Sequence, residues 1–434
     1  MVKERVTPTN ATVEPAQSEP SAQRSLGAML RRYRDFRWLL LGTLGTQAGQ
    51  WILNVAMAWL MLELTDSATW VGLIGFASGL PMLFISIPAG IMIDRHDRRV
   101  ILLWCQALLT VLAAGLTGLV LLDAVTPWQL LLGALLNGAL MAVNNATRQA
   151  IVPSAVEPGD LAGGFGLLTA GQNASRIVGP SIAGVLIGFF GAAGAFAFQT
   201  AVLFAALAMT FALSAAVAGD GRARASTVRP LEGIEYVRRR PVIRDLLLLA
   251  AIPMITVFPY VQLLPIFARD ILDIGAGGLG LMMAVSGVGA VIGGLLTSSS
   301  MRIHRIGAFI LLTTIAYGGI VLAFAFSHWL WLSLPLISLG SLTGSLFMSV
   351  NNTLVHMQIS DAVRGRVTGV YMLTQGLFPL GVLPMAIAAD FFGAPLAVAA
   401  AALLSSLGAL VLTLRSPALR GLTTSALGAS TTTR

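Results

Sequence analysis

Few side chains in this sequence could do chemistry, and the densest group of them is a polar segment between two long apolar runs. Residues 94–99 of this segment, Asp94-Arg95-His96-Asp97-Arg98-Arg99, carry two carboxylates and three guanidinium groups. Unpaired charges are costly in hydrocarbon, so the segment must lie in water between two membrane-spanning helices. Short Arg-rich loops stay on the cytoplasmic side of a membrane. The segment, here called the hinge (residues 90–99), therefore also predicts the orientation of the chain.

Arg176 is the second residue that could do chemistry. It falls about fifteen residues into an apolar run that begins near Leu161, which places it close to the middle of a membrane span. An Arg at that depth must face an interior cavity or a partner. It could be the counter-ion of an anionic substrate or of a carboxylate that is protonated during transport. Alternatively, it clamps backbone carbonyls or Asn side chains of a neighbouring helix.

A polar stripe marks one face of the first apolar run. Gln47, Gln50 and Asn54 have the i, i+3, i+7 spacing of one helical face, with Trp51 beside them. Such a stripe is not expected to face lipid. Further polar residues at comparable depth, which either bind substrate or join helices, are Asn137, Gln172, Asn173, Tyr260, Gln262 and Gln375.

The composition identifies the class of protein. Hydrophobic residues make up 56% and charged residues 11%, and the mean hydropathy is +0.82, far from the values of soluble domains. Long continuous apolar runs argue against a β-barrel, and 434 residues allow about twelve spans. The net charge of +8 is explained by cytoplasmic Arg residues rather than by nucleic-acid binding.

Metal, cofactor and enzymatic chemistry are not expected. The single cysteine, Cys105, excludes a disulfide within the chain and a cysteine-based metal cluster, and the four histidines are scattered. The sequence contains no nucleophile constellation and no phosphate-binding loop of the Walker type. We therefore expect neither an enzyme nor direct use of ATP.

The apolar runs predict an all-α membrane protein with twelve transmembrane helices in two parallel six-helix halves. The expected domains are a disordered tail with a basic collar (1–37), a first bundle (38–217), a cytoplasmic linker (218–243), a second bundle (244–414) and a polar tail (415–434). Within the linker, residues 230–237 form either a short amphipathic helix on the membrane surface or a solvated segment. The expected spans are 38–64, 70–93, 99–122, 127–149, 161–190, 192–217, 244–268, 275–299, 304–326, 329–357, 363–389 and 393–414.

An internal repeat supports the two-half plan. Met141-Ala142-Val143-Asn144-Asn145 in the fourth expected span returns as Met348-Ser349-Val350-Asn351-Asn352 in the tenth. Parallel halves of this kind build one large class of secondary transporters, with the substrate site between the halves.

The pattern Gly90-x-x-x-Asp94-Arg95-x-x-Arg98-Arg99, placed between the second and third spans, resembles the loop motif of the major facilitator superfamily. The resemblance implies a rocker-switch carrier in which Asp94 holds the cytoplasmic gate by pairing with Arg98 and with span eleven. A carboxylate at a helix end can gain and lose guanidinium bonds in this way; alternatively, the motif only sets topology. The gating residues expected from the resemblance are Gly90, Asp94, Arg95, Arg98, Arg99, Arg364 and Arg366.

Span five resembles the antiporter motif of exporters in that superfamily. Its residues are Gly166, Ser175, Gly179, Pro180 and Gly184, with Ser175 and Ala183 in the places of two motif glycines. Small residues at this spacing allow close helix packing, and the proline favours a bend. The motif therefore predicts a helix bend and close packing, with or without a bearing on the direction of transport.

Three further strings, at 59–65, 174–180 and 364–371, resemble the branch that contains bacterial siderophore exporters, macrolide efflux pumps and lysophospholipid transporters. The resemblance implies a transporter of the bacterial cytoplasmic membrane that exports an amphipathic or partly anionic small molecule by alternating access. The Arg-rich segments place both termini in the cytoplasm, and a monomer is expected. The alternatives are a lysophospholipid flippase of the same fold and a membrane receptor or scaffold without transport. Protons are a candidate coupling ion, although no Asp or Glu falls at mid-membrane.

Overall fold

The computed structural model describes residues 26–214, 230–301, 303–359 and 364–422, and the regular structure within these ranges is helical. The predicted tails and much of the predicted linker lie outside them. The side chains of Arg364, Arg366 and Gln375, although their backbone belongs to a helix, also lie outside the described part.

The helices before residue 215, here called the first half, follow the expected spans closely. They are α1 (Leu26–Arg32), α2 (Arg34–Thr65), α3 (Ala68–Arg95), α4 (Arg98–Leu121), α5 (Pro127–Ala155) and α6 (Leu161–Phe211), with a 3-10 turn at Pro158–Asp160. Local sequence explains several helix starts: the Ser67 side chain accepts a hydrogen bond from the Trp70 amide, and Thr126 forms a capping box with Gln129.

The helices after residue 229 form the second half. They are α7 (Pro230–Arg239), α8 (Pro241–Ile255), η3 (Phe258–Leu263), α9 (Leu264–Ile266), η4 (Phe267–Ile271), α10 (Gly275–Ser300), α11 (Ile306–Ala325), α12 (Leu330–Met357), α13 (Arg364–Gln375), α14 (Phe378–Phe392), α15 (Ala394–Arg415) and α16 (Pro417–Arg420).

Two expected spans are interrupted. The span predicted at 244–268 ends its regular helix at Ile255 and continues through η3, α9 and the π-helical η4. The span predicted at 363–389 is divided into α13 and α14 around Gly376 and Leu377. Pro259, Pro265 and Pro379 in these segments lack the amide hydrogen that a regular helix needs, which explains why the helices break there.

The boundary between the fifth and sixth expected spans is a sharp turn inside α6. Gly191 has φ 67° and ψ −177°, so the ribbon is continuous but the direction of the chain changes. A positive φ of this kind is readily adopted only by glycine. Ten stretches of the described chain are long and apolar enough to cross a membrane, and one of them, Pro158–Phe211, contains this turn. The count of twelve spans stays a prediction.

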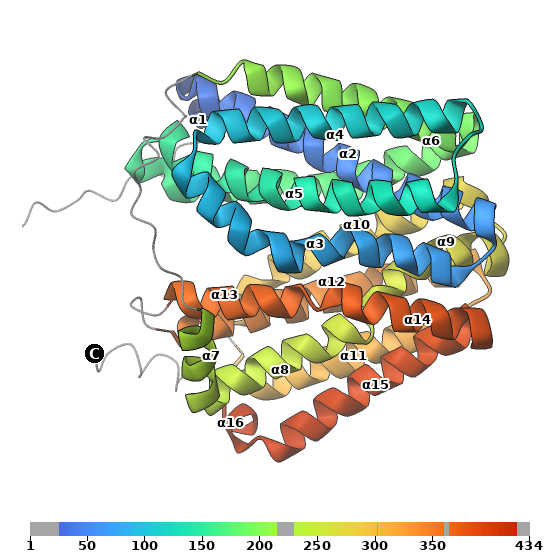
Figure 1. Cartoon of the computed structure of the whole chain (residues 1–434). Helices are drawn as coiled ribbons and strands as arrows, with labels where there is room; N and C mark the ends of the chain where they lie inside the picture. Colours follow the sequence, from blue (N-terminus) through green and yellow to red (C-terminus); the bar gives the residue numbers. More distant parts are fainter. Residues whose placement is uncertain (1–25, 215–229, 302, 360–363, 423–434) are drawn as a thin grey trace, which may run out of the picture.

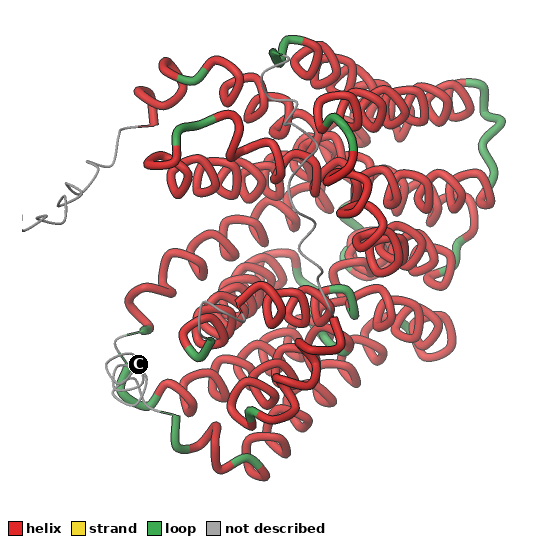
Figure 2. Tube along the Cα trace, turned by 60° about the vertical axis from the view of Figure 1, so that its left-hand side comes forward, coloured by secondary structure: helices red, strands yellow, loops and turns green. Residues whose placement is uncertain are grey.

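The two halves lie side by side with their helices running in roughly the same direction (Figure 1). In the first half α2 packs along α6, and α3 packs along α5; in the second half α10 packs along α12, and α11 along α15. The most extensive contacts between the halves are those of α6 with α10 and of α3 with α14, and smaller ones join α3 to η3 and α2 to α9. Seen after a 60° turn, the halves diverge from one another on the left of the view (Figure 2).

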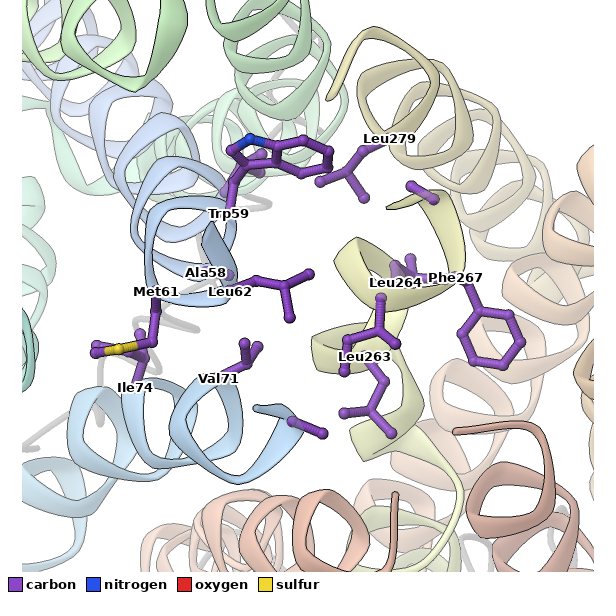
Figure 3. Packing of buried hydrophobic residues seen from close by; sticks show 14 of the residues in the cluster. Ala58, Trp59, Met61, Leu62, Val71, Ile74, Leu263, Leu264, Phe267 and Leu279 are labelled. Atoms are coloured by element: carbon purple, nitrogen blue, oxygen red, sulfur yellow. The ribbon is translucent and has the colours of Figure 1, made fainter. Parts of the chain in front are cut away.

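A shared apolar cluster closes the bundle at the end opposite the hinge, here called the far end. Trp59 and Leu62 of α2 and Val71 of α3 belong to the same buried cluster as Leu263 and Phe267 of the second half. Figure 3 shows Leu62 and Val71 of the first half facing Leu263 of the second, whereas Phe267 lies on the side of its segment that faces away from the first half. Burial of this surface from water stabilises the contact between the halves at the far end.

The linker contributes one described helix, α7. Its Val237 is buried in an apolar cluster of the second half, whereas Arg238 and Arg239 are exposed. The Arg239 guanidinium donates a 2.8 Å hydrogen bond to Glu235 and, with Arg238, lowers the pKa of that carboxyl group. Val237 of α7, with the partly buried Tyr236, thus packs on protein.

Candidate functional site

Small residues on α6 allow α2 to come close enough to build a site between them. A Cβ atom on Gly179 would lie 2.6 Å from the Cβ of Trp51 and 3.0 Å from the carbonyl oxygen of Ala48. The Ser175 hydroxyl donates to the carbonyl oxygens of Gly171, at 3.0 Å, and Leu44, at 3.4 Å. A larger side chain at Gly179 would push Trp51 away from α6.

Arg176 lies midway between Leu161, where α6 begins, and the turn at Gly191. At 1.5 Å per residue it is about 22 Å from each end of this helical stretch. Its guanidinium carbon is 5.4 Å from the ring centroid of Trp51, which is a cation–π geometry. Its side chain is exposed, and the next residue, Ile177, contacts Gly287 of α10. Arg176 therefore lies beside the contact between the two halves.

The guanidinium of Arg176 has unused hydrogen-bonding capacity. In the described part of the chain it makes no hydrogen bond and no ion pair, although the group carries five N–H donors. The neighbouring Gln172 is half-buried and Asn173 is exposed on the same helix. This arrangement can bind an anionic group that approaches along α6.

The predicted polar stripe of α2 is brought together with α5. Gln50 donates to the Asn54 side chain at 2.8 Å and accepts a 2.7 Å hydrogen bond from Asn137. Gln47 approaches Asn145 more weakly, at 3.4 Å. These amides are half-buried or buried and join helices in this conformation, which is one of the two roles that the sequence left open.

A buried polar network surrounds Arg148, a residue that is not among the candidate site residues predicted from the sequence. Arg148 is only 1% exposed, and it donates to Asn144 at 2.8 Å, Thr46 at 3.1 Å, Gln106 at 3.1 Å and Thr43 at 3.2 Å. These partners come from α2, α4 and α5 and are all neutral. The network therefore ties three helices of the first half around one enclosed cation.

The candidate residues of the second half lie in different surroundings. Tyr260 is 2% exposed, and its ring packs 5.9 Å from that of Phe324 within the second half. The side-chain amide of Gln262 packs against Gly75 of α3. A Cβ atom on Gly75 would lie 2.3 Å from the side-chain nitrogen of Gln262. Gln262 thus contacts the first half, whereas Tyr260 faces the core of its own half.

Two of the hinge arginines, Arg98 and Arg99, bind backbone carbonyl groups of the first half. Arg98 donates to the carbonyl oxygen of Ala150 at 2.9 Å, and Arg99 donates to those of Leu213 and Phe211 at 2.8 and 3.2 Å. Cations satisfy the free carbonyls at the C-terminus of a helix.

The predicted latch residue, Asp94, has no partner among the residues that the structure describes. Asp94 is half-buried and makes neither a hydrogen bond nor an ion pair within the described ranges. Asp97 instead caps α4 by accepting from the Arg99 amide at 2.7 Å. Arg95 and Gly90 are exposed, and a Cβ on Gly90 would meet nothing within 4 Å. The role of Asp94 as a latch stays a prediction.

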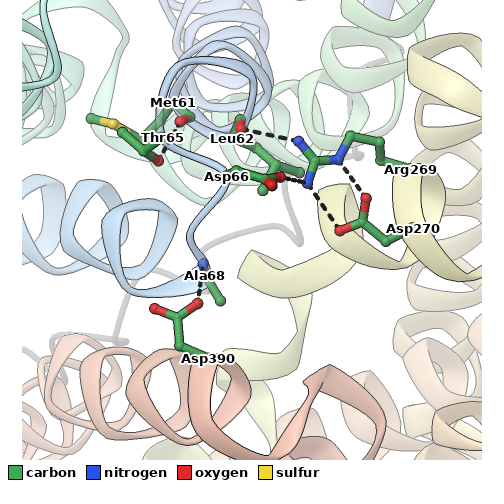
Figure 4. Close-up of polar contacts among 8 residues, drawn as sticks. All are labelled: Met61, Leu62, Thr65, Asp66, Ala68, Arg269, Asp270 and Asp390. Carbon is green, nitrogen blue, oxygen red and sulfur yellow. Dashed lines mark hydrogen bonds and ion pairs between the residues drawn. The ribbon is translucent and has the colours of Figure 1, made fainter.

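The far end carries a polar clamp across the halves (Figure 4). Asp390 of α14 accepts hydrogen bonds from the Ala68 and Thr69 amides, at 2.6 and 2.9 Å, and from the Ser67 hydroxyl at 2.7 Å. This anion lies at the N-terminus of α3, where the helix dipole favours negative charge.

A cation completes the clamp on the preceding helix. Arg269 donates to the Leu62 carbonyl oxygen at 3.0 Å, near the C-terminus of α2, and pairs with Asp66 and Asp270. The second half thus places a cation at the end of α2 and an anion at the start of α3. We call Arg269 and Asp390, with the partners named here, the far-end clamp.

Glycine contacts bring α6 and α10 together toward the same end. A Cβ on Gly184 would lie 2.4 Å from the Cα of Gly280 and 2.9 Å from the carbonyl oxygen of Ala276. Pro180 is accommodated inside α6. Gly166, by contrast, has nothing within 4 Å of its Cβ position. Among these motif residues, Ser175 and Gly179 face α2, and Gly184 faces α10.

Comparison with known proteins gives a consistent result over almost the whole chain. Residues 28–432 match the family described as transmembrane secretion effector. The chain is 26% identical over 353 residues to a staphyloferrin A transporter of Staphylococcus aureus (strain NCTC 8325 / PS 47), with 80% of this chain and 87% of that protein covered. An enterobactin exporter of Escherichia coli O1:K1 / APEC is 23% identical over 348 residues, covering 79% and 82% of the two chains.

Solved structures share the fold. A bacterial homolog of the human lysosomal transporter Spinster superposes with a TM-score of 0.74 at 15% sequence identity, with 89% of this chain and 97% of that chain covered. At this level of identity the likeness concerns the arrangement of the helices.

Proposed function

Because the chain belongs to the transmembrane secretion effector family of the major facilitator superfamily, a family of multi-pass membrane transporters, we propose that it exports an amphipathic, anionic small molecule. The observation that carries the proposal is Arg176, an exposed residue midway between Leu161 and Gly191 whose guanidinium stacks on Trp51. A cation at this depth is tolerated when it faces a polar interior, and it then marks a substrate pathway. The carboxylate or catecholate groups of siderophores fit such a site, in keeping with the two relatives.

The membrane topology of this proposal has twelve crossings. The ten apolar stretches include Pro158–Phe211, which we divide at the turn of Gly191. We add α2, whose 32 residues extend about 48 Å and whose polar stripe lowers its mean hydropathy. The hinge end is cytoplasmic in this topology because Arg95, Arg98 and Arg99 lie there.

The conformation described here corresponds to the state that opens toward the cytoplasm. In support, the far-end clamp and the shared apolar cluster hold the halves together at the far end. At the hinge end Arg98 bonds within its own half, and Asp94 is without a partner in the described ranges. In the opposite state the clamp must open and Asp94 gains its guanidinium partners.

Ligand-induced thermal stabilisation tests the proposed substrate class. The purified protein and Arg176→Gln are heated with a siderophore, a macrolide or a lysophospholipid, because a ligand that binds only the folded state raises the apparent stability. Arg305→Gln removes an exposed cation outside the spans and is the matched control. The proposal predicts stabilisation by the siderophore that is lost only in Arg176→Gln. Stabilisation by lysophospholipid alone would replace export with lipid flipping.

A further inference from the structure

The charges in the interior of the described membrane helices are of one sign. Arg148 and Arg176 lie well inside α5 and α6. The described carboxylates lie near helix ends or in loops, as Asp94, Asp245 and Asp390 illustrate. Some transport cycles use a mid-membrane carboxylate that binds and releases a proton. The described spans contain no carboxylate at that depth.

The two interior cations differ in their surroundings. Arg148 is enclosed by neutral partners on α2, α4 and α5, and all of these belong to the first half. Arg176 is exposed beside the contact with α10, and a guanidinium stays protonated at every physiological pH. When no anion is bound, the exposed site keeps a full positive charge.

Alternating access changes the potential that this charge experiences. When the far end is closed, the Arg176 site is open to the cytoplasm. When the hinge end is closed, the same site is open to the outside. We propose that Arg176 makes the return of the empty transporter voltage-dependent, so that a membrane potential, negative inside, drives the export cycle. The inference rests on the proposed alternating-access function and adds its energy source.

The charge balance follows directly. A transporter loaded with a monovalent anion has a neutral site, so its outward transition is insensitive to voltage. The empty site carries one positive charge inward, in the direction that an inside-negative potential favours. One full cycle therefore moves one negative charge outward without a coupled ion. If the charge crosses the whole field, the ratio of the two empty states changes up to about fifty-fold per 100 mV.

The experiment needs no substrate. Fluorescent dyes are attached to Ala124→Cys and His328→Cys in a Cys105→Ala background; both sites are exposed in far-end loops, one in each half. Single-molecule energy transfer between the dyes reports opening of the far end in proteoliposomes. A K⁺ gradient with valinomycin sets the potential, and the two orientations of the protein in the liposome are read separately. Arg176→Gln, the charge-retaining Arg176→Lys and the control Arg305→Gln are compared.

We expect the potential to close the far end of molecules whose hinge end faces the negative side, and to open it in the opposite orientation. Arg176→Gln should lose this response, whereas Arg176→Lys and Arg305→Gln should keep it. An empty protein that ignores voltage, or a response that persists in Arg176→Gln, would overturn the inference. Neither result affects ligand stabilisation, so failure of this inference and failure of the proposed function are distinguishable.

Discussion

The far-end clamp gives a quantitative prediction for Asp390→Asn. Asp390 accepts three hydrogen bonds, from the amides of Ala68 and Thr69 and the hydroxyl of Ser67. Hydrogen bonds to charged groups contribute about 1.5–3 kcal/mol each when buried, and much less at an exposed site such as this one. Asparagine keeps one acceptor oxygen but loses the charge at the start of α3. We therefore expect the closed far end to be weakened by about 1–2 kcal/mol.

This energy corresponds to a change of roughly 5- to 30-fold in the ratio of closed to open far ends. The dye pair at residues 124 and 328 measures that ratio directly. Asp123→Asn is the matched control, because Asp123 is an exposed far-end carboxylate that makes no hydrogen bond or ion pair among the described residues. An unchanged distribution in Asp390→Asn, or an equal shift in Asp123→Asn, would refute the reasoning.

Two further variants test the packing within the first half and the packing between the halves. Arg148→Met leaves the buried side-chain oxygens of Asn144, Thr46 and Thr43 without their donor. We expect a loss of about 3 kcal/mol or more, seen as a lower thermal midpoint than that of Arg305→Gln; equal midpoints would contradict it. Gly184→Leu places a side chain against Gly280, and we expect it to destabilise the closed far end by about 1–3 kcal/mol. Gly166→Ala is the control, because its added methyl group meets open space. Equal stability of the two variants would argue against the contact between α6 and α10.

Much of the fold could be predicted because it depends on local patterns. Apolar runs between polar turns placed α3, α4 and α5 within a few residues of their observed bounds. The predicted breaks were less accurate. The segment after Ile255 is interrupted by η3, and the chain turns inside α6 through a single glycine rather than a loop. Prolines and one backbone angle decide these cases, and hydropathy does not register either of them.

The site could be predicted in part. Arg176 and the stripe of Gln50 and Asn54 stand out in sequence because they are polar residues at mid-span. Arg148 was not predicted as part of a site because an Arg near the end of a span is already explained by the positive-inside pattern. The internal repeat offered one signal. It aligns Asn144 with Asn351 and therefore Arg148 with Val355, an apolar residue, which indicates that the Arg148 position is also buried.

The far-end clamp could not be predicted from sequence spacing. Asp66, Arg269 and Asp390 come from three separate segments, and only the packing of α3 against α14 and of α2 against α9 brings them together. The same tertiary dependence separates Tyr260 from the other candidate residues. Its ring packs toward Phe324, which no local pattern indicates.

The central claim is that Arg176 recognises negative charge on the substrate. The most direct test is a binding cycle in which the protein and Arg176→Gln are each titrated with staphyloferrin A and with its uncharged methyl ester. A charge-assisted hydrogen bond of about 1.5–3 kcal/mol predicts that the substitution weakens binding of the acid by roughly 10- to 100-fold and leaves binding of the ester nearly unchanged. Equal losses for acid and ester, or tight binding of the acid to Arg176→Gln, would contradict the account.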